Sequence, residues 1–161
     1  MAKTKRLAFM ALLTAMALTI FVIEAQIPAP VPIPGVKLGL SNIITLTAML
    51  LLGKKEAGIV LLLRIIMGAM FTGSPAALIY SISGGVLAYI VMCLLVGRFP
   101  EKLIWVVSAA AAVAHNAGLI VKTPGLLYYA PVLAASGIIT GVFTGVAAMY
   151  LVRAVRKIIK K

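Results

Sequence analysis

The sequence predicts an all-α integral membrane protein, with six transmembrane helices and both termini in the cytoplasm. Of its 161 residues, 63% are hydrophobic and only 11% are charged, whereas soluble domains have roughly 45–50% and about 25%. Long apolar segments alternate with short turn-like motifs, GKKE, TGSP, GRFPEK and KTPG. We therefore expect one six-helix transmembrane domain over residues 1–161.

Six apolar segments are the expected spans: residues 7–27, 38–53, 57–72, 75–96, 103–121 and 126–152. A helix needs about 20 residues to cross roughly 30 Å of hydrocarbon. The second and third segments are short, so they either span thinly or share part of the depth with their neighbours. The first segment is longer than the apolar core of a signal peptide, about 7–15 residues, and no small-x-small cleavage site follows it. We expect it to be a retained helix.

The basic residues predict the orientation of the spans. The formal net charge is +12, which in a soluble protein would indicate nucleic acid. With the N-terminus inside, twelve basic residues fall on the cytoplasmic side and only Lys37 and Lys122 on the outer side, while Arg64 lies within the third span. This asymmetry follows the positive-inside rule. The charge is thus explained by topology, and no nucleic-acid partner is expected.

Four prolines, Pro28, Pro30, Pro32 and Pro34, lie between the first two spans. Proline fixes φ and lacks an amide donor, so the loop is expected to be an extended, semi-rigid strap on the outer side. On spacing alone, a plain connector is an equally good interpretation.

Polar side chains inside the spans are few, and most fall in the outer half of their helices. Ionisable groups are costly in a bilayer and normally face protein or a wet cavity. We therefore predict an outward-facing cavity, lined by Glu24, Gln26, Lys37, Asn42, Arg64, Tyr80, His115 and Asn116. The alternative is that Glu24 and Arg64 form a structural ion pair and the other groups make interhelical hydrogen bonds.

Small residues four positions apart mark two helix faces. Ala11 and Ala15 lie on the first span, and Gly137, Gly141 and Gly145 on the sixth. Such spacing permits close approach of another helix. That helix belongs to a partner protein or to the same chain, and for the sixth span packing within the chain is at least as good an interpretation.

Catalytic chemistry is not expected. The chain has no aspartate, no P-loop of the GK[ST] kind, and only three well-separated carboxylates. His115 has no metal-ligating neighbour on its own span, and Cys93 is the single cysteine. We predict neither enzyme activity, nor a metal site, nor a cofactor.

Several motifs resemble a known family. PIPGVKLGLSNIITL, LLRIIMGAMFTGSPAALIYSISGG, AVAHNAGL and YYAPVLAASGIITGVFTG are similar to the Gx transporter family, which is often labelled heptaprenyl diphosphate synthase component I. The resemblance covers nearly the whole chain. The short six-helix pattern, with its alanine face on the first span, also resembles the substrate-binding S-components of energy-coupling factor (ECF) transporters.

The resemblance implies a subunit that takes up a small molecule across the membrane of a bacterium or archaeon. An ECF coupling subunit and ATPases would be its partners, docking on Ala11 and Ala15. The cationic Lys37, Arg64 and Lys122 favour a vitamin-like or anionic ligand, such as a flavin-like compound or a prenyl diphosphate. The rival interpretation is a non-catalytic membrane subunit associated with isoprenoid diphosphate metabolism.

Overall fold

The protein is a bundle of helices. The computed structural model describes residues 3–27 and 39–159, so Lys37 and the four loop prolines lie outside the described residues. The helices, in chain order, are α1 (Lys3–Gln26), α2 (Ser41–Leu51), α3 (Lys54–Thr72), α4 (Pro75–Leu95), η1 (Glu101–Leu103), α5 (Ile104–Lys122), η2 (Pro124–Tyr129) and α6 (Ala130–Ile159).

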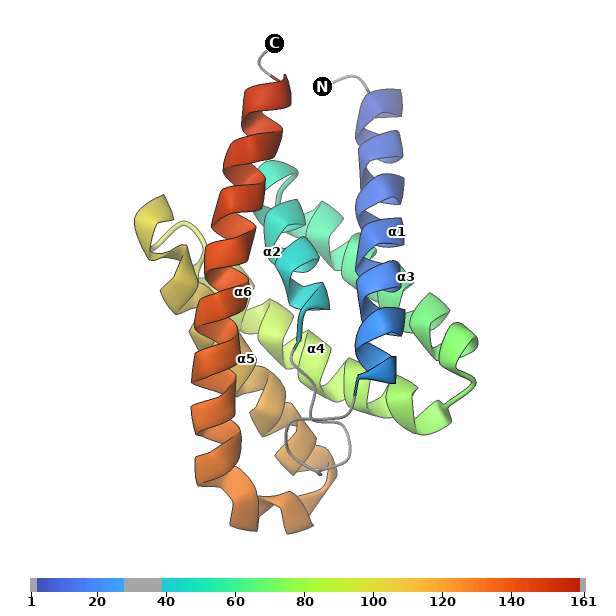
Figure 1. Ribbon diagram of the computed structural model, residues 1–161, viewed down its shortest axis with the longest axis vertical. Coiled ribbons are helices and arrows are strands. Elements are labelled where there is room, and N and C mark those ends of the chain that lie inside the picture. The colour runs from blue at the N-terminus through green and yellow to red at the C-terminus, as the bar shows by residue number, and fades with distance from the viewer. Residues whose placement is uncertain (1–2, 28–38, 160–161) are drawn as a thin grey trace.

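Both ends of the described chain lie at the same end of the bundle (Figure 1). The long helices α1 and α6 run along its long axis in opposite chain directions, and α2 lies between them. Helix α2 packs against α1, α3 and α6, so it occupies the centre of the bundle. Helices α3 and α4 run obliquely to this axis.

Four segments are long and apolar enough to cross a membrane: α1, α4, η1 with α5, and η2 with α6. The described part of the chain is thus a helical membrane protein, whereas the count of six spans stays a prediction. Helix α2 has 11 residues, which gives a length of about 16 Å at 1.5 Å per residue. Eight of those residues are buried. We conclude that α2 is an internal helix of roughly half the membrane depth.

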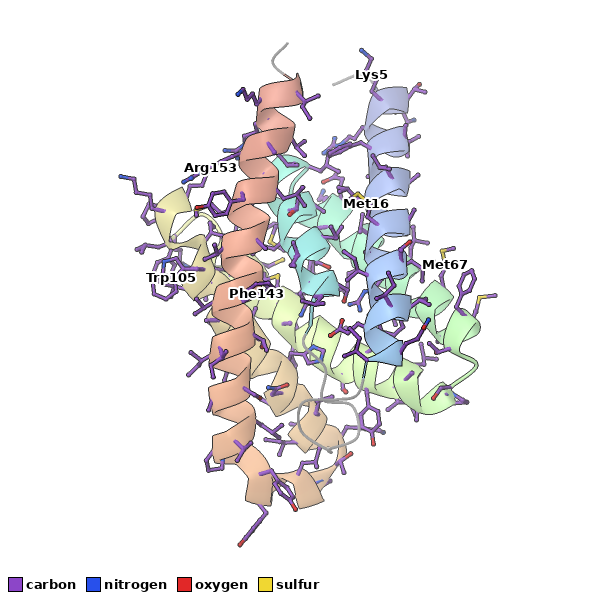
Figure 2. All side chains as sticks on the ribbon, in the orientation of Figure 1. Lys5, Met16, Met67, Trp105, Phe143 and Arg153 are labelled. Atoms are coloured by element: carbon purple, nitrogen blue, oxygen red, sulfur yellow. The ribbon has the colours of Figure 1, made fainter. Side chains whose placement is uncertain are left out.

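Large apolar side chains cover the outside of the bundle. Met16, Met67, Trp105 and Phe143 are all exposed, and Figure 2 shows Trp105 and Met67 on opposite sides of the bundle. Lys5 and Arg153 lie toward the end that carries the termini. In water such a surface would be unstable, but it is the surface that lipid hydrocarbon requires.

The glycine face of the sixth predicted span packs inside the chain. A Cβ atom on Gly141 would lie 2.4 Å from the Ala109 Cα atom, and one on Gly145 would lie 2.5 Å from the Trp105 Cα atom. Only glycine permits this approach of α6 to α5. The interpretation as intrachain packing is therefore confirmed for this face.

Two arginines bind the C-terminal end of α2 at the end of the bundle that carries the termini. Arg6 of α1 pairs with Glu56 at 2.6 Å and donates to the Leu52 carbonyl oxygen at 3.0 Å. Arg156 of α6 pairs with Glu101 at 2.6 Å and donates to the Leu50 carbonyl oxygen. The last carbonyl oxygens of a helix accept no hydrogen bond from their own helix. Here arginines of α1 and α6, which flank α2, donate to two of them.

The observed helix ends differ from the expected spans mainly at α6. The expected span began at residue 126, but residues Pro124–Tyr129 form the 3₁₀ helix η2 and α6 begins at Ala130. Pro131 lies in the first turn of α6, where its missing amide breaks no helical hydrogen bond. At the other end α6 continues past residue 152 to Ile159. Arg156 and Lys157 in its last turn interact favourably with the helix dipole.

Candidate functional site

A cavity of about 240 Å³ lies among α1, α2, α3, α4 and α5. Its apolar lining is Phe21, Gly39, Ala76 and Ala77. The polar residues that line it are Glu24, Ser41, Asn42, Arg64, Ser74, Tyr80, Ser81 and His115. Each of the five helices contributes at least one of these polar groups. The cavity thus contains both buried charged residues of the described helices, Glu24 and Arg64.

Arg64 is the cation of this cavity, and it is buried, with 4% of its surface exposed. Its Nη1 atom donates to the Ser41 hydroxyl at 3.0 Å. Its Nε and Nη2 atoms are also buried and have no hydrogen-bond partner among residues 3–27 and 39–159. A buried donor left without an acceptor costs free energy. Arg64 is therefore ready to bind an acceptor that enters the cavity.

Phe21 fixes the guanidinium from one side. The Arg64 Cζ atom lies 5.4 Å from the centroid of the Phe21 ring, a cation–π arrangement. The ring itself fits against α3 only because residue 68 is glycine, since a Cβ atom there would lie 2.7 Å from it. Arg64 and Gly68, one turn apart on α3, thus act together with Phe21 of α1.

Glu24 is the buried carboxylate of the cavity. It accepts a hydrogen bond from the backbone amide of Gly39, which has a positive φ of 70° and leads into α2. Its charge attracts the Arg64 guanidinium. Glu24 therefore has two roles, since it anchors the start of α2 to α1 and offsets part of the charge of Arg64.

The corner between α3 and α4 forms the rim of the cavity. Gly73 ends α3 in the left-handed region, with φ 60°. Ser74 caps α4, accepting from the Ala77 amide at 3.2 Å, and Pro75 occupies the first helical position. Ala76 and Ala77 in the first turn line the cavity. The positive end of the α4 dipole therefore faces the same space as the Arg64 donors, and both favour an anion.

His115 connects the main cavity to a smaller one between α2, α5 and α6. The smaller cavity has a volume of about 10 Å³ and shares Gly39, Asn42 and His115 with the main one. Asn116 lines only this second cavity, where its Nδ2 atom donates to the Leu133 carbonyl oxygen at 2.7 Å. The smaller cavity has about the volume needed for a single water molecule.

The structure brings together five of the eight residues predicted to bind substrate: Glu24, Asn42, Arg64, Tyr80 and His115. Asn116 lies behind this group in the smaller cavity. Gln26 is exposed at the end of α1 and lines neither cavity. Lys37 lies outside the described residues.

Sequence reasoning missed Phe21 and the lining by the first turn of α4. A signal for each was present in the sequence. Phe21 precedes Glu24 by three residues, which places both on one face of a helix. The consecutive Gly73, Ser74 and Pro75 are typical of one helix ending and another beginning.

The alanine face on α1 is exposed. Ala11 and Ala15 lie on the outside of the bundle, together with Ala8 and Thr19. No described part of this chain covers them, in contrast to the buried Gly141 and Gly145 of α6. The two small-residue faces that the sequence could not distinguish therefore have different environments.

Comparison with known proteins places the chain in a family. It matches no curated relative and no solved structure at a significant level. The family described as heptaprenyl diphosphate synthase component I matches residues 13–151, from the middle of α1 to near the end of α6. The match therefore includes all the described residues that line the two cavities, and the chain belongs to the heptaprenyl diphosphate synthase component I family.

Proposed function

We propose that the protein is a substrate-binding membrane subunit, similar to an ECF S-component, that captures a small anionic molecule from outside the cell. The observation that carries the proposal is Arg64. It is buried in a membrane bundle, lines a cavity, and keeps two guanidinium nitrogens without a hydrogen-bond partner among the described residues. Such a group is costly in lipid unless something compensates it.

The position of the cavity supports capture from outside. The two termini lie at one end of the bundle (Figure 1), and the basic Arg6 and Arg156 lie at that end. The positive-inside rule assigns this end to the cytoplasm. The cavity lies toward the other end of α2, beside Ser41 and Asn42. In this orientation the proposed six spans have both termini inside, and the site faces outward.

The exposed face on α1 supports dependence on a partner. Ala11 and Ala15 are small and uncovered, so another membrane helix could approach the α1 backbone closely. An ECF coupling subunit with its ATPases is the proposed occupant, because the chain itself has no nucleotide-binding P-loop.

The cavity volume restricts the ligand. At about 240 Å³, the space is smaller than the roughly 300–1,000 Å³ of pockets that enclose drug-sized ligands. The described walls therefore suit the anionic part of a vitamin-like molecule rather than the whole of a flavin.

The family description favours a second candidate function. A protein described as component I of a heptaprenyl diphosphate synthase could be a non-catalytic membrane subunit that recruits a soluble prenyl synthase. The two functions differ in the partner, since one requires an ECF coupling subunit and ATPases and the other a soluble synthase.

Native mass spectrometry of the purified protein tests the first proposal. We expect an anionic small molecule bound to the wild-type chain and absent from Arg64→Gln. The matched control is Arg153→Gln, which removes an exposed cation far from the cavity and should retain the ligand. Tagged protein should also co-purify the coupling subunit and ATPases. Co-purification of a prenyl synthase instead, with no small molecule bound, would establish the second function.

A further inference from the structure

A second concave surface adjoins the cavity at the corner between α3 and α4. This groove has a volume of about 350 Å³. The described residues that line it are Ile66, Ala69, Met70, Gly73, Pro75 and Leu78, with Ser74 as the one polar side chain among them. The side chains of its rim are open to the surroundings, and Met70 is 76% exposed. In a membrane protein this surface meets hydrocarbon or the interface rather than water.

Ser74 lines both spaces. On one side of it is the polar cavity, with Arg64 and the first turn of α4. On the other side is the groove, where the described lining residues other than Ser74 have no polar side chain. The two sites therefore meet at one residue, a cationic pocket on one side and an apolar groove on the other.

We infer that the ligand is an amphipathic anion, whose charged head binds Arg64 in the cavity and whose hydrocarbon tail leaves past Ser74 into the groove between α3 and α4. This inference rests on the proposed function, because it takes the cavity as the ligand site. It adds that the ligand is held partly at the lipid-facing surface. Such a ligand arrives from outside the cell by way of the outer leaflet and enters the site laterally.

Three observations agree with this occupant. The cavity is small enough that a ligand of ordinary size must extend beyond it. Within the described part of the chain, the head end supplies two buried donors without an acceptor and a helix N-terminus, and both favour negative charge. The described residues that line the groove include no charged one, so a tail there strands none of these side chains in an ionised state.

Binding of two alkyl phosphates to the full chain in phosphatidylcholine nanodiscs tests the inference. Ethyl phosphate carries the head alone, and decyl phosphate carries the head with a tail. Transfer of the tail from water would strengthen binding roughly fourfold for each added methylene. Because the bilayer competes for the tail, we expect decyl phosphate to bind only about tenfold more tightly than ethyl phosphate in total. Signal from empty nanodiscs is subtracted.

Ala69→Phe should fill the groove without touching the cavity. We expect this variant to lose the tenfold advantage of decyl phosphate and to bind ethyl phosphate as the wild type does. Met70→Trp, at the exposed rim, is a second variant with the same expected result. The matched control is Ala135→Phe on the exposed surface of α6, which should change neither affinity.

Photo-crosslinking with decyl phosphate that carries a terminal diazirine locates the tail. Labelling should concentrate on residues 66–78, and unlabelled decyl phosphate should compete for it whereas decanol should not. Even labelling of Phe143 and other lipid-facing residues would show annular lipid contact and overturn the inference. If both phosphates bind equally, the tail site is wrong and the anion site stands. If neither binds, the anion site itself is wrong.

Discussion

The ring of His115 lies directly against the backbone of Gly84. A Cβ atom on Gly84 would approach the His115 Cε1 atom to 2.6 Å and both ring nitrogens to 2.7 Å. Glycine at this position of α4 therefore determines where the imidazole of α5 lies. Because His115 lines the main cavity and the smaller one, this contact also shapes both cavities.

Gly84→Ala should accordingly move the ring and weaken binding. We expect the affinity for ethyl phosphate to fall about three- to tenfold, which corresponds to the loss of roughly one hydrogen bond. Isothermal titration in nanodiscs measures it. Gly125→Ala is the matched control, since no atom of residues 3–27 or 39–159 lies within 4 Å of a Cβ atom there. Unchanged affinity in Gly84→Ala would show that the ring position does not matter to the ligand.

Arg64 is expected to be needed for both folding and binding. Removing one member of a buried charge pair typically costs about 3–5 kcal/mol. Arg64→Ala should therefore lower thermal stability, because the Glu24 carboxylate loses the nearby cation. It should also abolish binding, because the guanidinium donors are gone. Glu24→Gln should be milder for folding.

Arg64→Lys separates the two roles. It keeps the positive charge near Glu24 but loses the guanidinium fork. We expect stability close to the wild type but weaker binding of ethyl phosphate. The comparison variant is Ser41→Ala, which removes the acceptor of the Arg64 Nη1 atom and should also weaken binding. Arg64→Lys should bind ethyl phosphate no more tightly than Ser41→Ala does. Wild-type affinity in Arg64→Lys would mean that charge alone holds the ligand.

Asn42 and Asn116 should behave differently, although both are buried asparagines. Asn116 donates to the Leu133 carbonyl oxygen, so its truncation removes a buried hydrogen bond between α5 and α6. The Ser136 hydroxyl donates to the same oxygen, and we therefore expect Asn116→Ala to destabilise the protein by only about 0.5–1.5 kcal/mol, with little effect on ethyl phosphate binding. Asn42→Ala should weaken binding, because Asn42 lines the main cavity. Thermal denaturation and titration of both variants measure the difference, and weaker binding in Asn116→Ala alone contradicts this assignment.

The two small-residue faces lead to opposite expectations. Ala11→Leu with Ala15→Leu should abolish co-purification of the coupling subunit and leave stability unchanged, because both positions are exposed. Gly141→Ala should destabilise the isolated protein, since its added methyl group meets the α5 backbone. Co-purification of the partner and the midpoint of thermal unfolding are the two measurements. A large loss of stability in the Ala11→Leu, Ala15→Leu variant would contradict the docking proposal.

Cysteine accessibility in intact cells tests the topology. In a Cys93→Ser background, a membrane-impermeant maleimide should label a cysteine at Gly125, which is exposed between α5 and α6. It should not label one at Lys55 or Lys102, although both are exposed too. Labelling at Lys55 before lysis would refute the assignment of that end to the cytoplasm.

The cavity could be predicted from the sequence because polar residues are rare in the spans. Glu24, Arg64 and His115 each stand out against apolar neighbours, and burial in a membrane leaves few places for them other than a shared interior. The same reasoning could not separate Asn116 from His115, which is adjacent in sequence. Successive residues of a helix point about 100° apart, so only the packing of α5 against α6 decides which cavity each one lines.

The sequence pattern also did not predict how α2 lies in the membrane. A run of apolar residues over 38–53 fits a thin span as well as a buried helix, because periodicity is absent when every face is covered. What encloses α2 is the contact with α1, α3 and α6, a property of distant parts of the chain.

The shortness of α2 has a consequence for the permeability barrier. Ser41, at its first residue, lines the cavity, and the Leu50 and Leu52 carbonyl oxygens near its other end accept from arginines of the terminal end. The cavity and the terminal end of the bundle are therefore separated by the length of one helix of 11 residues. That length is about 16 Å, or roughly half of the hydrocarbon thickness. If the proposed function holds, a ligand beside Arg64 would have only this layer left to cross.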